Sequence, residues 1–460
     1  MNKYLIVAQG INKAKFFCRV QEAILQNDPT AMVEFVAILP GAYEFLKKRN
    51  KSVILLSDVI KKSKNYYKIS GINYEEFCEF EIARHPNFEK EYFKNAVEDY
   101  LSAFYYIFKE LYMPTHILLW NSEEIHNRTV KFVAQSLGIE RFFHFETGFF
   151  PGTMVVDSKG VNFKSSLKGY DFENVKVNQK VLSSYIEKLT STRLNKVEAK
   201  KSKNFTTEEI LLKVKEVLKS YIGLQDKYYY LEVPPRNFLK QLICLLESIR
   251  FNLFKKLKKD KEMAIYQKFT RNFKRIVFVP LQVPDDTQVL VNSTWINSME
   301  TLIDVCLKSI PKDIGIVFKT HPASIGKHSI KSYKQLLKIQ DKAILVNYLD
   351  THQLIRESSI VITINSTVGL EALLYRKPVI VLGNAFWAVE PIVKKAVNSS
   401  DLKKKILEIY NGYDGNIELV DKLLYQIIFC YLKEINFKNP TPKQLADLVS
   451  FIKDGVAKLE

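Results

Sequence analysis

Residues 360–371 read Ile-Val-Ile-Thr-Ile-Asn-Ser-Thr-Val-Gly-Leu-Glu, and this stretch decides the fold class. Residues 360–364 form an apolar, β-prone run, and a helical pattern begins after the three short polar residues that follow. A buried strand that passes through a polar turn into a helix is the building unit of an α/β domain. Asn365, Ser366 and Thr367 suit a helix start, because their side chains can accept its free backbone N–H groups.

The same helix start is a candidate anion site. Free N–H groups and the positive end of the helix dipole favour a negatively charged ligand such as a phosphate. The plainer alternative is simple N-capping, which explains Ser366 or Thr367 but gives no reason for Glu371 one turn further on. The carboxylate of Glu371 could accept both hydroxyls of a ribose.

The strand, turn and helix order recurs along both halves of the chain. In the second half we expect strands at 276–280, 315–319, 343–346, 360–364 and 378–382, with helices near 296–309, 329–339, 351–357 and 367–375. In the first half we expect strands at 4–8, 53–56, 116–120 and 142–145, and a helix that begins near Ala14. Two doubly wound, Rossmann-type domains that face a cleft describe the GT-B architecture of nucleotide-sugar enzymes. The expected fold is therefore α/β and GT-B-like.

Four parts are expected along the chain. Residues 1–180 form an N-terminal Rossmann-like domain, and 276–400 form a C-terminal Rossmann-like domain. In a GT-B enzyme the first would serve the acceptor and catalysis, and the second would bind the nucleotide sugar. Residues 181–275 form a helical, basic linker or insertion that Pro234-Pro235 interrupts. Residues 401–460 are closing helices that could pack on either domain.

A net charge of +18 predicts an anionic partner. Between residues 240 and 275 there are eleven Lys or Arg against three Asp or Glu, interleaved with apolar residues at helical spacing. This pattern suits peripheral contact with an anionic inner membrane, or equally a solvated basic helix packed by its apolar stripe. We expect no nucleic-acid partner, because the chain has no zinc-finger spacing, aromatic RNA-binding signature or recognition-helix motif.

The remaining composition predicts a folded cytoplasmic protein. The chain is 47% hydrophobic and 12% aromatic, which is enough for large cores, and no apolar run reaches membrane-spanning length. Its N-terminus enters a strand-like segment without a signal-peptide pattern. The five cysteines are scattered and show no metal-ligand spacing, so we expect reduced, buried thiols and no metal site.

Residues 145–162 carry two carboxylates, Glu146 and Asp157, on a glycine-broken stretch around a short β-prone run. An enzyme could keep an acid and a nucleophile on such a loop. An acidic residue before Ser-Lys-Gly is also an ordinary hairpin turn residue. Gln9 and Asn121 also follow expected strands, so they should face one crevice together with Glu146.

In the second half, polar residues again follow strands. Lys319-Thr-His-Pro would project His321 toward a phosphate, although a lone strand-end histidine is more often structural. Gln282 offers an amide that could read a nucleobase edge. Asp286 and its neighbour Asp285 are either turn residues or a rim of the donor site.

Five motifs in this order resemble the bacterial capsule polysaccharide synthesis family, which includes retaining β-Kdo transferases of the KpsC and KpsS type. They are Glu146-Thr-Gly-Phe, Asp157-Ser-Lys-Gly-Val-Asn, Pro280-Leu-Gln-Val-Pro-Asp-Asp, Lys319-Thr-His-Pro and Asn365-Ser-Thr-Val-Gly-Leu-Glu-Ala-Leu. The similarity runs from about residue 115 to 390. Family members often carry an Arg shortly after the first motif, and here none follows Glu146.

The resemblance implies a GT-B glycosyltransferase that transfers Kdo from CMP-β-Kdo to a surface glycan or glycolipid with retention. It assigns Asp157 as the nucleophile of a covalent Kdo adduct and Glu146 as acid/base or acceptor-orienting group. It places CMP against a donor set, with no metal or other cofactor: Lys319, His321, Asn365, Ser366, Thr367, Glu371 and, near the cytosine, Gln282. Arg128, Arg236 or a central lysine could contact the Kdo carboxylate in place of the missing Arg.

Two further readings stay open. One is an inverting, sialyltransferase-like enzyme that uses another CMP-nonulosonate, since His-Pro and a Ser-Thr helix start suit that chemistry as well. The other is a non-catalytic protein of capsule assembly or export, which the basic central stretch supports. If calorimetry shows no CMP binding, a non-catalytic role in assembly or export is favoured.

Overall fold

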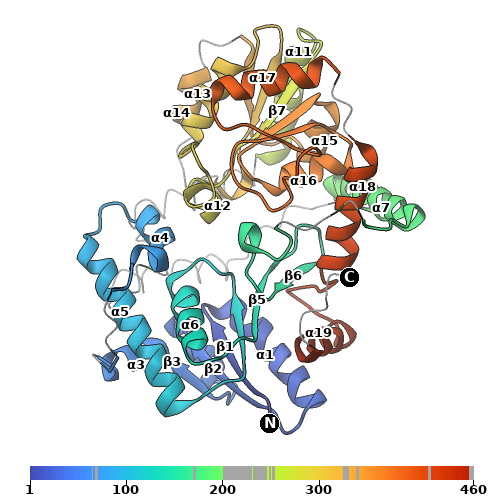
Figure 1. Cartoon of the computed structure of the whole chain (residues 1–460). Helices are drawn as coiled ribbons and strands as arrows, with labels where there is room; N and C mark the ends of the chain where they lie inside the picture. Colours follow the sequence, from blue (N-terminus) through green and yellow to red (C-terminus); the bar gives the residue numbers. More distant parts are fainter. Residues whose placement is uncertain are drawn as a thin grey trace. The chain divides into compact units, whose positions relative to one another are not determined.

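The computed structural model describes residues 1–64, 66–67, 71–168, 172, 174–199, 231, 246–247, 250, 254–324, 331–337, 341–412 and 416–454. The chain divides into two compact units (Figure 1). Unit 1 comprises 1–170, 225–234 and 427–460, and unit 2 comprises 171–224 and 235–426. Unit 1 is therefore built from three separate segments of the chain and unit 2 from two. 

Unit 1 contains a six-stranded sheet in the order β3-β2-β1-β4-β5-β6. Its strands are β1 (Lys3–Ala8), β2 (Met32–Ala37), β3 (Val53–Leu55), β4 (His116–Trp120), β5 (Phe142–Thr147) and β6 (Met154–Asp157). All pairs are parallel except β5 with β6, which is antiparallel. The order 3-2-1-4-5 is that of a Rossmann-type unit, and the strand order reverses between β1 and β4.

Helices cover both faces of this sheet. They are α1 (Ile11–Asn27), α2 (Pro40–Lys47), α3 (Leu56–Lys62), α4 (Glu75–Arg84), α5 (Lys90–Tyr106), α6 (Ile125–Ser136) and α19 (Pro442–Asp454), with short turns at Ile107–Leu111, Asn162–Lys164 and, from the end of unit 2, Gln426–Tyr431. Alternate residues of β1 point to opposite faces of the sheet and pack into separate hydrophobic cores there, as in any pleated strand. Tyr4 and Ile6 pack with α1 and α19, whereas Leu5 and Val7 pack with the α3 to α6 side.

Unit 2 contains a second six-stranded sheet in the order β12-β11-β10-β7-β8-β9, and every pair is parallel. The strands are β7 (Ile276–Pro280), β8 (Gly315–Lys319), β9 (Ala343–Val346), β10 (Ile360–Thr363), β11 (Val379–Val381) and β12 (Lys394–Lys395). Taken in chain order this is again 3-2-1-4-5-6, with the reversal between β7 and β10. The fold is thus α/β with two doubly wound Rossmann-type sheets, which confirms the expected class.

The helices of unit 2 follow the strands as the sequence predicts. They are α7 (Gln179–Ala199), α11 (Lys255–Thr270), α12 (Thr287–Leu290), α13 (Met299–Ser309), α14 (Lys331–Leu337), α15 (Thr351–Glu357), α16 (Thr367–Leu374), α17 (Ser399–Tyr410) and α18 (Ile417–Tyr425), with a short turn at Pro322–Ser324. The closing helices separate: α17 packs on α13 of unit 2, and α19 packs on α1 of unit 1.

The basic central segment is only partly described. Much of 200–253 lies outside the described residues, and with it most of the expected insertion at 181–275. None of the described helices is both long enough and apolar enough to cross a membrane. Helix α11 exposes Phe254 at its N-cap and Leu257 and Ile265 within the helix, among several lysines.

Candidate functional site

The helix start that decides the fold lies at the switch point of unit 2. The Oγ of Ser366 accepts a hydrogen bond from the N–H of Val368 at 3.2 Å, and the N–H of Ser366 donates to the Oγ1 of Thr363 at 3.2 Å. Helix α16 has no acidic residue in its first turn, and Thr367 is exposed there. Its N-terminus therefore combines a neutral polar cap with an undiminished helix dipole.

Gln282 and Asn365 brace this turn across the two central strands. The Nε2 of Gln282 donates to the Oδ1 of Asn365 at 2.9 Å, and the Oε1 of Gln282 accepts the N–H of Asn365 at 3.2 Å. Asn365 also donates from Nδ2 to the carbonyl of Gln288 at 2.7 Å. Both side chains are buried, and their amides are used inside the protein. The geometry therefore favours positioning of the turn over direct reading of a base by Gln282, whose contact with a nucleobase stays a prediction.

Strand β8 delivers His321 to the same edge of the sheet. The N–H of Ala323 donates to the Nδ1 of His321 at 3.1 Å, so the neutral imidazole carries its proton on Nε2. The ring is exposed, whereas Lys319 is buried and its Nζ donates to the carbonyl of Thr320 at 3.3 Å. His321 thus presents a donor of the type that a phosphate oxygen accepts.

Glu371 of the predicted donor set and the predicted rim residue Asp286 have clear local contacts. The Oε2 of Glu371 lies 3.5 Å from the Nε2 of His352, whose Nδ1 is 2.9 Å from the hydroxyl of Tyr375. Asp286 caps the short helix α12 by accepting the N–H of Gln288 at 2.9 Å, which fits the turn alternative for this residue. Desolvation by neighbouring protein atoms raises the pKa of the Asp286 carboxyl, although the residue is exposed at the surface.

In unit 1, Asp157 lies at the end of β6 and is almost completely buried. Its Oδ1 accepts the N–H groups of Lys159 at 2.7 Å and Gly160 at 3.2 Å. Its Oδ2 accepts the N–H and Oγ–H of Ser166 at 2.8 and 2.7 Å, and the hydroxyl of Tyr431 at 3.0 Å. Five donors hold this carboxylate in place, an arrangement that fixes the hairpin end. Nucleophilic attack by Asp157 stays a prediction, and this geometry does not favour it.

Glu146 differs from Asp157 in exposure. It lies near the end of β5, is half-buried, and its Oε1 accepts the N–H and Oγ1–H of Thr147 at 2.8 and 3.0 Å. Gln9 follows β1 and Asn121 follows β4, so the parallel strands bring these three residues to one edge of the sheet, as predicted. Asn121 has a φ of 71° and its Oδ1 accepts the N–H of Glu123 at 3.0 Å, which makes it a turn residue.

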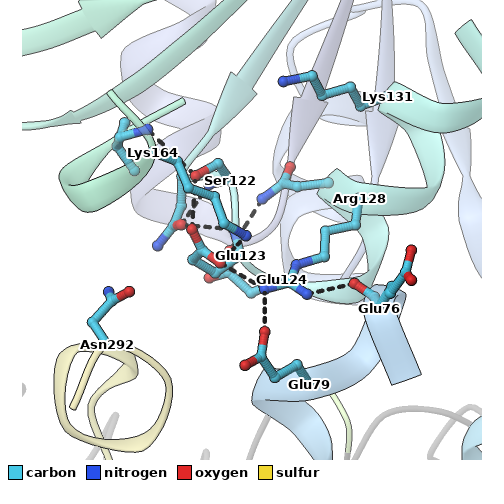
Figure 2. Close-up of polar contacts among 12 residues, drawn as sticks. Glu76, Glu79, Ser122, Glu123, Glu124, Arg128, Lys131, Lys164 and Asn292 are labelled. Atoms are coloured by element: carbon cyan, nitrogen blue, oxygen red, sulfur yellow. Dashed lines mark hydrogen bonds and ion pairs between the residues drawn. The ribbon is translucent and has the colours of Figure 1, made fainter. Parts of the chain in front are cut away.

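Figure 2 shows a cluster of charged side chains around the loop between β4 and α6, to which α4 and α6 also contribute. The Oε2 of buried Glu123 lies 2.7 Å from the Nη2 of Arg128 and 2.8 Å from the Nζ of Lys164. Burial alone would raise the pKa of the Glu123 carboxyl, but the charges of Lys164 and Arg128 outweigh it and lower that pKa. Arg128 also donates to the carbonyl of Glu76 and pairs with Glu79. Its guanidinium is thus engaged in holding α6 to α4.

A residue that the sequence did not single out occupies the start of α6. Glu81, on α4, is fully buried, and its Oε1 accepts the N–H of Ile125 at 2.9 Å. A protein carboxylate therefore takes the position at which an anionic ligand would meet this helix. No local sequence signal marks Glu81, because α4 reaches α6 only through the tertiary fold.

Other predictions fall outside what the structure describes. Arg236, one candidate for the Kdo carboxylate, lies outside the described residues. Among the described residues, no group of three or more His, Cys, Asp and Glu side chains is arranged to hold a metal ion. The metal-independent reaction stays a prediction.

Comparison with known proteins identifies the family. Residues 115–405 match the family model described as capsule polysaccharide biosynthesis protein, and the chain belongs to this family. Each of its two units contains a doubly wound, Rossmann-type sheet.

Individual relatives are more distant. The chain is 31% identical over 176 residues to protein FixF of Sinorhizobium fredii, covering 38% of this chain and 42% of that protein. It is 26% identical over 230 residues to the capsule polysaccharide modification protein LipB of Neisseria meningitidis serogroup B, covering 46% and 51%. The matches thus span about half the length of these curated relatives or less. Among solved structures, KpsC of Thermosulfurimonas dismutans, a beta Kdo 2,7 transferase, aligns with a TM-score of 0.37 and 14% identity over 97% of this chain and 99% of that one.

Proposed function

We propose that this chain is a glycosyltransferase of capsule polysaccharide biosynthesis that transfers Kdo from CMP-β-Kdo to a bacterial glycan or glycolipid. Family membership supports the pathway. The observation that carries the proposal is the neutral, polar N-terminus of α16 at the switch point of unit 2. Ligands of open parallel sheets bind at this point, and phosphates prefer helix N-termini.

Each part of CMP has a candidate partner in unit 2. The phosphate would accept hydrogen bonds from the first N–H groups of α16, from Thr367 and from the Nε2 of His321. The ribose hydroxyls would donate to Glu371, one turn into the same helix. Gln282 and Asn365 would hold the turn in the required conformation through the hydrogen bonds between them.

Retention at the anomeric carbon is proposed to proceed by two displacements. A protein carboxylate oxygen bonds to that carbon while the bond to the CMP phosphate breaks. An acceptor hydroxyl oxygen then replaces the carboxylate and gives its proton to a base. The sequence resemblance names Asp157 as the nucleophile, but the exposure of Glu146 makes it the better placed carboxylate in unit 1.

Intact-mass measurement separates these roles. Incubation with CMP-β-Kdo should give an adduct of one Kdo residue that is lost in the nucleophile variant, while a calorimetric titration should show CMP binding in every variant. If Glu146→Gln abolishes the adduct and Asp157→Asn keeps it, Glu146 is the nucleophile, and the reverse result supports Asp157. If the unmodified protein binds CMP and transfers Kdo to an acceptor, but neither it nor any variant forms an adduct, the inverting alternative is favoured. Absence of CMP binding by the unmodified protein would contradict the proposal and favour a role in assembly or export.

Peripheral contact with the cytoplasmic face of the inner membrane is proposed for helix α11. Leu257 and Ile265 are both exposed, and lysines surround them in sequence. Exposed apolar residues beside lysines bind anionic lipid surfaces. Liposomes that contain phosphatidylglycerol should float the protein, and the double change Leu257→Ser and Ile265→Ser should reduce flotation. Unchanged flotation would contradict contact through this helix.

A further inference from the structure

Lys13 occupies an unusual position in unit 1. It lies in the first turn of α1, half-buried, and its Nζ is 4.0 Å from the ring centroid of Trp120 and 5.9 Å from that of Phe437. The two rings pack against each other with centroids 4.8 Å apart. The aromatic faces attract the ammonium, and they fix where its charge lies.

The ammonium of Lys13 lacks a polar partner within the described part of the chain, where no hydrogen bond or ion pair to its Nζ is found. Burial lowers the pKa of Lys13 by more than the charges of Glu146 and Glu124 raise it, so the net shift is downward. An ammonium has three donors, and rings satisfy none of them in the manner of an oxygen. Arg128 is the opposite case, because Glu123 occupies its guanidinium at 2.7 Å.

The position of Lys13 in the sheet is that of a ligand-binding residue. Helix α1 follows β1 directly, Trp120 ends β4, and Glu146 lies near the end of β5. These three strands are neighbours, and the order reverses between β1 and β4. Lys13 therefore lies at the switch point of unit 1, at the carboxyl edge where open α/β sheets bind their ligands.

We propose that Lys13 binds the carboxylate of an acidic sugar, with Trp120 holding the ammonium in position. This inference rests on the proposed function, in which a sugar acid is transferred. A substrate carboxylate that approaches Glu146 meets a like charge, and Lys13 is a cation whose field reaches Glu146. A single ammonium with two carboxylates in electrostatic range suits a monoanion such as a carboxylate better than a phosphate dianion.

The test compares Lys13→Met, which keeps the apolar stem, with Lys13→Arg, which keeps the charge. Lys15→Met is the matched control, since Lys15 is exposed on the same helix. The donor arm measures by calorimetry how much more tightly CMP-β-Kdo binds than CMP. The acceptor arm measures KM for an acceptor that ends in an acidic sugar and for the same acceptor with its carboxylate reduced to an alcohol.

In either the donor or the acceptor measurement, Lys13→Met should lower the ratio of affinities for the charged and uncharged ligands by about 10- to 100-fold. This is the expected contribution of one charge-assisted hydrogen bond. The measurement that shows this loss identifies whether donor or acceptor supplies the carboxylate. Lys13→Arg should restore most of the preference, and Lys15→Met should leave it unchanged. The inference would be overturned if Lys13→Met changed the preference for the charged ligand by less than twofold in both measurements. It would also be overturned if Lys13→Met and Lys13→Arg lost that preference equally while their melting temperatures were unaltered. CMP binding, which uses unit 2, reports separately on the proposed function.

Discussion

The helices α6 and α16 follow corresponding central strands of the two units, yet their N-termini differ in charge. In unit 1 a buried carboxylate from another helix, Glu81, accepts the first N–H of α6. In unit 2 the hydroxyl of Ser366 caps α16, and its first turn has no acidic residue. The same fold thus offers one helix terminus that the protein has neutralised and one that still favours an anion.

This difference assigns the units different tasks. An anionic nucleotide would meet a like charge at α6 but a polar, uncharged turn at α16. Unit 1 instead concentrates carboxylates and cations that pair with each other, as in Glu123 with Arg128 and Lys164. We therefore expect nucleotide binding to depend on unit 2, and changes at α6 to act on stability.

The largest effect is expected from Thr367→Glu, which gives α16 the charge that α6 already has. CMP affinity should fall about 100-fold because a carboxylate would repel the phosphate at close range. Stability should not fall, since an acid at a helix N-terminus is favourable by about 0.3–1 kcal/mol. Calorimetry and thermal melts measure the two effects, and Ser399→Glu at the start of α17 is the control. Unchanged CMP affinity in Thr367→Glu would contradict nucleotide binding at the start of α16.

Acid should destabilise unit 1 through His144. This ring is fully buried, and burial, followed by the charge of Lys131, lowers its pKa from 6.5 to about 4. Below pH 6.5 the His144 imidazole therefore binds a proton in the unfolded chain but stays neutral in the folded chain. The free energy of unfolding decreases progressively between pH 6.5 and 4 as a result. Urea unfolding should show a loss of about 2 kcal/mol from this group between pH 7 and 5. His144→Gln should reduce the loss of stability between pH 7 and 5 by this amount, and the exposed His321→Gln should not. An unchanged slope in His144→Gln would contradict the assignment.

Glu81→Gln tests whether the buried carboxylate of Glu81 stabilises the N-terminus of α6. Unfolding free energy should decrease by about 1–3 kcal/mol, because a charged acceptor for the first N–H of α6 is lost from a buried site. CMP affinity should be the same as in the unmodified protein. The exposed Glu79→Gln is the control and should cost less than about 1 kcal/mol. A drop in CMP affinity in Glu81→Gln would place the nucleotide near α6 instead.

The smallest effect is expected from Glu371→Gln. CMP affinity should fall about tenfold, as for one hydrogen-bond acceptor that loses its charge. Binding of 2′,3′-dideoxy-CMP should be weaker than that of CMP and insensitive to this change. Equal losses for both nucleotides would show that Glu371 acts on the helix or on His352, and not on the ribose.

Sequence patterns located the sheets well but not every strand. The strands β4, β7 and β8 have the bounds that their apolar runs predict, because fully buried parallel strands are mostly apolar. The partly exposed strand β9 also has the predicted bounds. The sequence missed β2, whose first half is partly exposed and whose pattern includes Glu34. It also missed β12, which has only two residues.

Site residues were easier to place than to explain. Strand ends correctly indicated that Gln9, Asn121 and Glu146 share one edge, since parallel strands fix this. Asp157 accepts hydrogen bonds from Tyr431, 274 residues away, as well as from residues close in sequence, and Gln282 braces a residue 83 positions away. No local pattern specifies the distant partners. Lys13 and Glu81 were missed for the same reason.

Hydrogen exchange measured by mass spectrometry, with and without CMP, tests whether the nucleotide binds at α16 and not at α6, because it reports on both helix termini in one experiment. We predict that CMP slows exchange in peptides that cover 364–371 at the start of α16 and leaves peptides that cover 121–128 at the start of α6 unchanged. Slower exchange at 121–128 without slower exchange at 364–371 would contradict nucleotide binding at the start of α16.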